Sequence, residues 1–317
     1  MFEKIISIIF LFIFCTFFPP EKTMLFVGDM MFDRGVEYYI YQNGGDFSYP
    51  FQKIKDDIDA DVVFGNLEGP IVSNPVFISN HSMVFSFDKR IAQSLSAAGF
   101  DILSLANNHT FNMERDGFEE TKDFLDENGI AYAGEPIGCD YEDAYIGDDF
   151  IIFAINQTFD FNCLEEEILS SIERLAEEDK FLIVSPHWGA EYKSTPSEAQ
   201  KDLAHKMIDS GADLIMGGHS HVIGSIEKYK GKIIFYSLGN FIFDQSFSEE
   251  TEQGLMVRAS FYSDRIEYEL IPAKENKSQP AAMADREKED LLIWLSSISD
   301  ENIRDEIKKG VIVQSVQ

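Results

Sequence analysis

The stretch Leu214-Ile215-Met216-Gly217-Gly218-His219-Ser220-His221 joins a short apolar run to two glycines and a pair of histidines. A short apolar run of this kind is typical of a buried strand. Because His219 and His221 are two residues apart, an extended segment would direct both side chains to the same side. The glycines let the backbone come close to a ligand. The sequence therefore predicts a strand that ends in two histidines able to hold a metal ion.

Other predicted strands end in polar residues in the same way. The strands are predicted at 23–27, 62–64, 102–105 and 181–185, and the residues that follow them include Asp29, Glu68, Asn108, His109 and His187. In open α/β sheets the carboxyl ends of the strands form the ligand crevice, so we expect these side chains to converge. Carboxylates, imidazoles and an amide oxygen suit a divalent ion such as Zn, Mn or Fe. Each residue alone has an ordinary structural explanation, as a turn, a capped loop or a core histidine, and their co-occurrence is what favours a metal site.

The rest of the chain alternates short apolar runs with helical periods, which predicts the α/β fold class. Further strands are expected at 151–155 and 233–236, a hairpin at 255–261 and 266–271, and helices at 114–128 and 198–210. We expect one main domain over residues 24–273, followed over 274–317 by a linker and an amphipathic C-terminal helix. His205 lies inside the second predicted helix with no motif around it, and we expect it to be structural.

The N-terminal residues 1–20 contain an apolar run of 14 residues, Ile5 to Phe18, between Lys4 and Pro19-Pro20. A helix that spans a bilayer needs about 20 residues, so the run fits the apolar part of a secretory signal better than a full span. A short retained anchor and a buried N-terminal helix are the alternatives. We therefore expect an exported protein, at the cell surface or attached to the membrane by this segment.

The composition limits the partners. The 317 residues are 44% apolar and can bury one large core, while 56 acidic against 26 basic residues give a net charge of −30. Such a surface repels phosphate backbones, so nucleic acid is not an expected partner. The same charge opposes a polyanionic substrate unless bound cations reverse the sign locally. Cys139 and Cys163 either form a disulfide or remain two free buried thiols, and the sequence leaves both open.

The strand-end residues belong to a series of six ordered motifs. These are Val27-Gly28-Asp29-Met30-Met31, Asn66-Leu67-Glu68, Leu105-Ala106-Asn107-Asn108-His109, His187-Trp188-Gly189-Ala190-Glu191-Tyr192, Gly218-His219-Ser220-His221 and Tyr236-Ser237-Leu238-Gly239-Asn240-Phe241. Together, over residues 24–244, they closely resemble the bacterial CapA family of capsule-synthesis and poly-γ-glutamate biosynthesis proteins. That family is similar to the calcineurin-like metallophosphatases. The resemblance therefore implies a sandwich of two mixed β-sheets flanked by helices, with a dinuclear metal site.

The resemblance also implies roles for single residues. The implied metal ligands are Asp29, Glu68, Asn108, His187, His219 and His221. His109 would steady the reacting oxygen or protonate the leaving group, and Arg34, Glu191 and Asn240 would contact substrate or orient ligands, although capping or ion-pair roles fit these three equally. The chain departs from the wider pattern at Glu68 and Met31, where aspartate and histidine are usual. The number of metal ions that the site binds, one or two, therefore remains open. Asn112 stands where many family members have Asp.

The sequence leaves three candidate functions open. The first is a role in making an anionic polymer, capsule or poly-γ-glutamate, together with membrane-bound synthesis machinery. The second is a metal-dependent hydrolase of phosphoesters or related bonds. The third is a metal-binding scaffold without catalytic activity.

Overall fold

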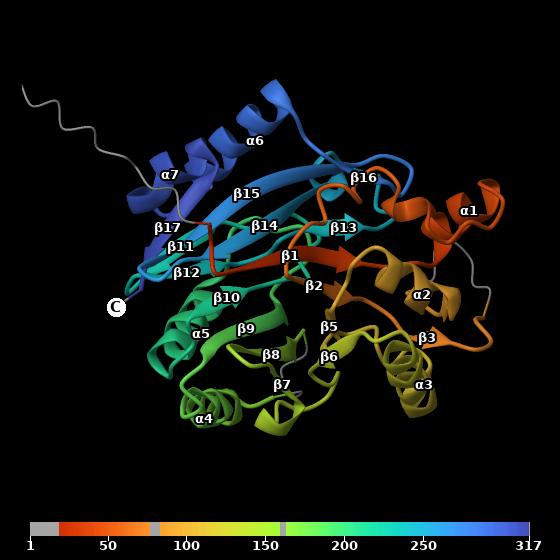
Figure 1. Cartoon of the computed structure of the whole chain (residues 1–317), viewed down its shortest axis with the longest axis horizontal. Coiled ribbons are helices and arrows are strands. Elements are labelled where there is room, and N and C mark those ends of the chain that lie inside the picture. The colour runs from red at the N-terminus through yellow and green to blue at the C-terminus, as the bar shows by residue number, and fades with distance from the viewer. Residues whose placement is uncertain (1–18, 77–82, 159–162, 317) are drawn as a thin grey trace, which may run out of the picture.

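The computed structural model describes residues 19–76, 83–158 and 163–316. Two β-sheets pack face to face, and helices cover both outer faces (Figure 1). The last two helices of the chain instead bury their apolar residues in the core that the two sheets share. The larger sheet runs in the order β16 (Pro280–Ala282), β15 (Arg265–Glu275), β14 (Gln253–Phe261), β1 (Lys22–Met30), β2 (Val62–Leu67), β5 (Ile102–Ser104) and β6 (Ala131–Ala133), with β13 (Asn240–Ile242) beside β1 and β17 (Val311–Ser315) beside β15. The smaller sheet runs in the order β11 (Ile226–Tyr229), β12 (Lys232–Phe235), β10 (Leu214–Met216), β9 (Phe181–Trp188), β8 (Phe150–Gln157) and β7 (Tyr145–Ile146).

Both sheets are mixed. In the larger sheet β1 runs parallel to β2 and antiparallel to β14, and in the smaller sheet β12 runs parallel to β10 and antiparallel to β11. The helices are α1 (Arg34–Gln42), α2 (Arg90–Ala97), α3 (Glu114–Glu127), α4 (Glu165–Ala176), α5 (Glu198–Asp209), α6 (Asp285–Ile298) and α7 (Arg304–Lys309). The expected α/β sandwich of two mixed sheets flanked by helices is confirmed, as are the strands that the sequence predicts.

The alternation of side chains along β1 explains why its sequence is apolar without a polar face. Met24 and Phe26 point into the core between the two sheets, while Leu25 and Val27 join the core on the outer face of the larger sheet. Successive residues of a strand point to opposite faces, so a strand covered on both sides must be apolar at every position. This double burial holds the end of β1, and with it Asp29, in the middle of the molecule.

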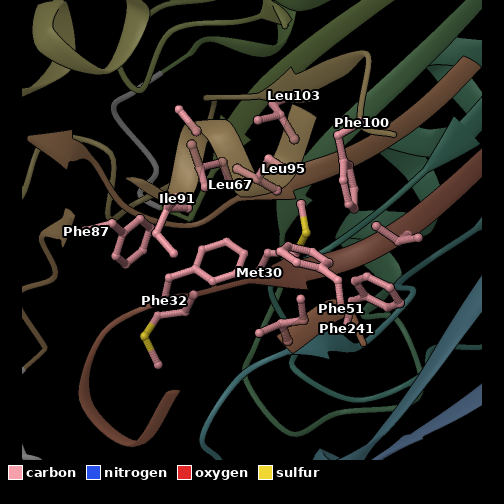
Figure 2. Packing of buried hydrophobic residues seen from close by; sticks show 14 of the residues in the cluster. Met30, Phe32, Phe51, Leu67, Phe87, Ile91, Leu95, Phe100, Leu103 and Phe241 are labelled. Carbon is pink, nitrogen blue, oxygen red and sulfur yellow. The ribbon is translucent and has the colours of Figure 1, made fainter. Parts of the chain in front are cut away.

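Aromatic side chains fill much of the core on the outer face of the larger sheet (Figure 2). The ring of Phe32 lies edge-on to Phe87, with ring centres 5.7 Å apart, and also contacts Phe51 at 5.9 Å. Each such pair contributes about 0.5–1.5 kcal/mol beyond its buried area. The packing fastens the segment that leads from β1 into α1.

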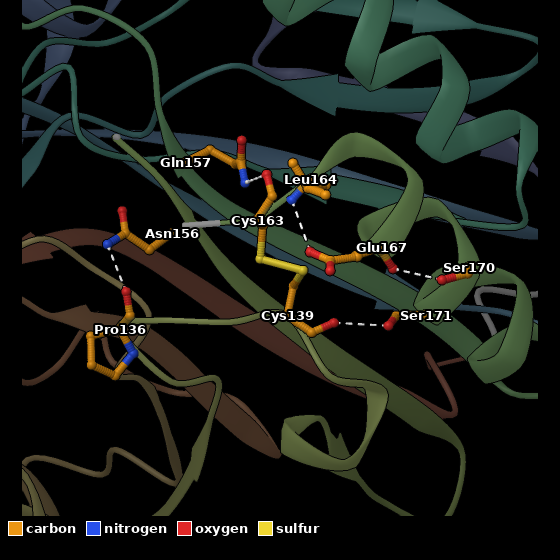
Figure 3. Close-up of a disulfide and its surroundings, with 9 residues drawn as sticks. All are labelled: Pro136, Cys139, Asn156, Gln157, Cys163, Leu164, Glu167, Ser170 and Ser171. Atoms are coloured by element: carbon orange, nitrogen blue, oxygen red, sulfur yellow. Dashed lines mark hydrogen bonds between the residues drawn. A yellow bond between two sulfur atoms is a disulfide. The ribbon is translucent and has the colours of Figure 1, made fainter. Parts of the chain in front are cut away.

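The core on the outer face of the smaller sheet contains a disulfide (Figure 3). Cys139 and Cys163, whose pairing the sequence leaves open, are joined, with Cα atoms 5.9 Å apart and a sequence separation of 24. Ser171 Oγ donates a hydrogen bond to the carbonyl oxygen of Cys139 at 2.8 Å, and Gln157 Nε2 donates to that of Cys163 at 3.2 Å. The disulfide therefore ties the loop before β7 to the segment that leads into α4.

Reduction of this disulfide is expected to lower the free energy of unfolding by about 3 kcal/mol, because a loop of this length regains its conformational freedom in the unfolded chain. Urea unfolding with and without dithiothreitol measures the difference. The Cys139→Ser, Cys163→Ser double variant is the control, since reductant should leave its unfolding midpoint unchanged. Equal midpoints for the natural chain under both conditions would contradict the prediction.

The C-terminal part of the chain differs from its expected form. The linker expected at the start of residues 274–317 instead contains the end of β15, a turn at 276–279 and the edge strand β16, where Lys274 pairs with Ala281. Pro280 is tolerated there because an edge strand leaves one row of N–H groups unpaired. The amphipathic stretch that follows forms α6, whose Leu291 and Leu295 are buried.

The expected location at the cell surface or membrane needs correction. Crossing a bilayer takes about 20 helical residues, and α3 and α6 have 14 each. No helix among the described residues is long and apolar enough to span a membrane. The apolar run at residues 5–18, on which the expectation depends, lies outside the described part of the chain.

Candidate metal centre

The polar strand ends predicted from the sequence meet at one edge of the sandwich. Asp29 near the end of β1 pairs in register with Asn66 of β2 and Asn240 of β13. On the other sheet, His187 of β9 forms a β-bridge to Gly218, just after β10. Parallel strands carry their carboxyl ends to the same edge, so both sheets contribute side chains there.

Three of these residues form a tight buried group. Donor atoms of Asp29, Glu68 and His221 all lie within 4.8 Å of one another. His221 Nε2 is 3.6 Å from Glu68 Oε1. Atoms that bind one ion at about 2.1 Å lie roughly 3 to 4 Å apart. The spacing of this group therefore suits a metal ion.

Glu68 provides the clearest sign that a cation belongs in this group. Both of its carboxylate oxygens are buried and have no hydrogen-bond partner, and His219 Nδ1 is buried and unpartnered as well. Burial, together with the negative charges of Asp29 and Glu191, raises the pKa of Glu68 well above its usual value. Burial also raises the pKa of Asp29 to about 6. A buried carboxylate without a partner is costly unless a proton or a cation compensates it, so this donor set fits a divalent ion.

Burial favours the neutral form of the histidines of the centre. Burial lowers the pKa of His219 to about 3 and lowers the pKa of His187 well below its usual value. Burial also lowers the pKa of His221. A neutral imidazole has a free lone pair, which is the form that binds metals.

His219 and His221 do not lie in an extended segment, contrary to the expectation from their spacing. Their φ angles are 85° and 57°, in the left-handed region, which non-glycine residues rarely adopt. The two rings nevertheless lie 5.9 Å apart, and the His219 ring lies 4.8 Å from that of His187. The turn after β10 thus brings the rings close together. The left-handed backbone destabilises the fold by about 1 kcal/mol or more for each of the two residues.

Asn240 determines which nitrogen of His221 carries the proton. Its amide nitrogen donates to the carbonyl oxygen of Thr251 at 3.0 Å, so its amide oxygen is an acceptor, 2.9 Å from His221 Nδ1. His221 Nδ1 is therefore the donor of this bond. The lone pair of Nε2 is left facing Glu68, as in ligand histidines held by an outer partner.

Asn66 is a residue of the centre that the sequence places in a motif but that was not predicted to have a role in the site. Its Nδ2 donates to Asp29 Oδ1 at 2.8 Å and lies 3.3 Å from His187 Nδ1, while His187 Nε2 lies 3.0 Å from Asn108 Oδ1. It thus connects a carboxylate of one sheet with an imidazole of the other. Its position two residues before Glu68, at the end of β2, was the available signal.

His109 also approaches Glu68, with its Nε2 3.9 Å from Glu68 Oε1. Asn112 Oδ1 accepts from the backbone N–H of Phe85 at 2.7 Å and lies 3.0 Å from His109 Nδ1. Because that oxygen is an acceptor, Nδ1 carries the proton and Nε2 is free. The ring also packs against Phe85, with ring centres 4.3 Å apart, and burial lowers the pKa of His109 to about 4.

Arg34 and Glu191 lie at the rim of the group. Arg34 forms an ion pair with Asp244, and its guanidinium lies 4.9 Å from the ring of Phe85. Glu191 is half-buried and affects the centre through its charge. The structure thus brings together all the residues that the sequence singled out, with Asn66 added.

Comparison with known proteins agrees with this geometry. The family model "Bacterial capsule synthesis protein PGA_cap" matches residues 23–147 and 148–245. The chain belongs to this family. Among its PGA_cap relatives, the capsule biosynthesis protein CapA of Bacillus anthracis is 31% identical over 263 residues, which cover 74% of this chain and 63% of that protein. The PGA biosynthesis protein CapA of Bacillus subtilis is 28% identical over 276 residues, which cover 81% of this chain and 72% of that protein.

This PGA_cap chain therefore spans less than two thirds of the B. anthracis protein. A solved phosphatase from Mycoplasma pneumoniae aligns with 83% of this chain and 92% of its own, at a TM-score of 0.47 and 12% identity. A match at this level carries no argument about function.

Proposed function

We propose that this PGA_cap protein takes part in the biosynthesis of an anionic polymer of the capsule or polyglutamate type, and that it does so with a divalent metal centre. The proposed ligands are Asp29, Glu68, Asn108, His187, His219 and His221. The names of two relatives, a capsule biosynthesis protein and a PGA biosynthesis protein, support this kind of polymer. The observation that supports the metal is the pair of buried, unpartnered oxygens of Glu68 beside Asp29 and His221.

The donor set suits one or two ions of Zn, Mn or Fe. A bound divalent ion would supply Lewis acidity and offset the negative charge of a substrate. This local positive charge matters because the whole chain carries a net charge of −30, which otherwise repels an anionic polymer or a phosphoester.

Deletion of the gene in a host that makes such a polymer tests the first part of the proposal. We expect the amount of surface polymer to fall and to recover when the gene is returned on a plasmid. An unchanged amount of polymer would contradict the proposed role.

A metal-dependent hydrolase is the second candidate, and the orientation of His109 favours it. Asn112 holds the proton on Nδ1, so Nε2 is free to accept a proton at the side of the ring that faces Glu68. A positioned group of this kind is what general acid–base catalysis needs. Turnover on a panel of phosphomonoesters and diesters, with Zn, Mn and Fe supplied in turn, would support this candidate.

Replacement of His109 by alanine separates the hydrolase from a scaffold. If the protein is a hydrolase, turnover should fall about 10²- to 10⁴-fold, because proton transfer loses its side chain, while the metal content stays unchanged. A scaffold should still restore polymer synthesis in the deletion strain. His205→Ala is the matched control, since that histidine bonds to Glu227 outside the centre, and it should leave both measurements unchanged.

A further inference from the structure

Two exposed aromatic side chains stand beside the proposed metal centre. Tyr192 is 44% exposed and Phe247 is 65% exposed. Their rings meet edge to face at 5.2 Å, and the ring of Tyr192 lies 6.3 Å from that of His221. Adjacent aromatic rings left in solvent next to polar groups are a common mark of a binding site. They form an aromatic rim, the pair Tyr192 and Phe247, on the His221 side of the centre.

The backbone holds Tyr192 firmly in this exposed place. Its N–H donates to the carbonyl oxygen of Ser220 at 2.7 Å, between the two histidines of the centre. Its φ is 61°, a left-handed conformation that a bulky residue adopts only where the surroundings impose it. Backbone strain of this kind concentrates at functional sites. The Tyr192 ring is thus fixed relative to His219 and His221.

Phe247 is held by the loop 244–252, which is bonded to the same centre. The buried Thr251 closes this loop, since its Oγ1 donates to the carbonyl oxygen of Gln245 at 2.6 Å. The carbonyl oxygen of Thr251 accepts from Asn240, which orients His221. Gln245 Nε2 also donates to Tyr192 Oη at 3.4 Å. Both rings are therefore positioned before any ligand arrives, which lowers the entropy cost of binding.

The charges near the aromatic rim favour binding of an anionic group at the metal centre and of an uncharged group at the rim. Glu191, beside Tyr192, is acidic, and Arg34 is engaged with Asp244, so the anionic part of a substrate has to meet the metal centre rather than the rim. The aromatic rim offers apolar ring surface to the part of the substrate that lies next to its anionic group.

We infer that Tyr192 and Phe247 bind the organic group next to the anionic group of the substrate, so that this site selects anionic compounds with an apolar or planar group close to the charge. The inference rests on the proposed function, because the metal centre is what binds the charged group. A small hydrophilic anion would gain nothing from the rim.

Binding of phenylphosphonate and methylphosphonate to the metal-loaded full chain, by titration calorimetry, tests the inference. We expect phenylphosphonate to bind about tenfold more tightly, a ratio in keeping with one or two aromatic contacts. Phe247→Ala, and Tyr192→Asn, whose new side chain tolerates a positive φ, should each reduce this ratio while methylphosphonate binding and metal content stay unchanged. Tyr38→Ala removes an exposed aromatic residue of α1 and should leave the ratio intact.

Equal affinity for the two phosphonates, or a preference that survives both rim substitutions, would overturn the inference without contradicting the metal centre. The metal content of the same samples shows whether the metal centre itself is absent. A chain that binds no metal overturns the proposed function, and this inference with it.

Discussion

The His219→Ala, His221→Ala double variant is expected to lose its bound metal. In the natural chain we expect one or two equivalents of a transition metal, because Glu68 and His219 offer buried atoms with no other partner. Removal of a partner that only orients a ligand typically weakens metal binding about 10- to 100-fold, so the loss of two ligands should cost more than about 100-fold. Mass spectrometry of the purified full chain measures the metal content directly.

A matched histidine is available as the control for this experiment. His205→Ala removes an imidazole that bonds to Glu227 and stacks on Tyr229, outside the proposed metal centre. Its metal content should equal that of the natural chain. Metal retained in the double variant, or absent from the natural chain, would refute the metal centre and favour a scaffold that needs none. Circular dichroism of each variant shows whether the fold has survived.

Gly28→Ala is expected to destabilise the fold by more than about 3 kcal/mol, the range that severe overpacking reaches. A Cβ atom at this position would lie 1.9 Å from the carbonyl oxygen of Gly239. The oxygen belongs to the backbone, and the Cβ is bonded directly to the Cα atom of a residue in β1. The adjacent Asp29 N–H donates to that same oxygen at 3.0 Å, so neither side can yield without moving β1 or the segment before β13. Urea unfolding measures the loss.

Gly44→Ala separates this clash from the general cost of replacing a glycine. Gly44 has a φ of 81° but nothing within 4 Å of an added Cβ, so alanine there should cost only about 1 kcal/mol. Equal losses for the two variants would show that the close approach at Gly28 does not hold in solution. A Gly28→Ala variant that folds with reduced stability should also bind metal more weakly, since Asp29 would be displaced.

The strands and their polar ends could be predicted because their cause is local. A strand buried on both faces has to be apolar at every position, as along β1 and β9, and such runs are visible in the sequence. The carboxyl ends of parallel strands share one edge, so the convergence of Asp29 and Glu68 followed from their places in the chain. His187 belongs to the other sheet, and its approach depends on how the two sheets pack.

Other features depend on contacts between segments far apart in the sequence. The bond between Asn66 and Asp29 joins residues 37 positions apart, and His187 Nε2 meets Asn108 across 79 positions. The pairing of Cys139 with Cys163 needs their Cα atoms within reach, and spacing along the chain does not specify that distance. The left-handed φ of His219 is likewise imposed by its surroundings and opposes the local preference of its residue type.

The sequence by itself thus determined the fold class, the edge at which the functional side chains meet and the chemistry of the donor set, because burial patterns and residue types are local properties. Tertiary structure alone decided which imidazole nitrogen is free, which carboxylate is left without a partner, that residues 274–283 continue the sheet, and that Tyr192 and Phe247 meet beside His221. These depend on hydrogen bonds and packing between distant segments, and such contacts exist only once the chain has folded.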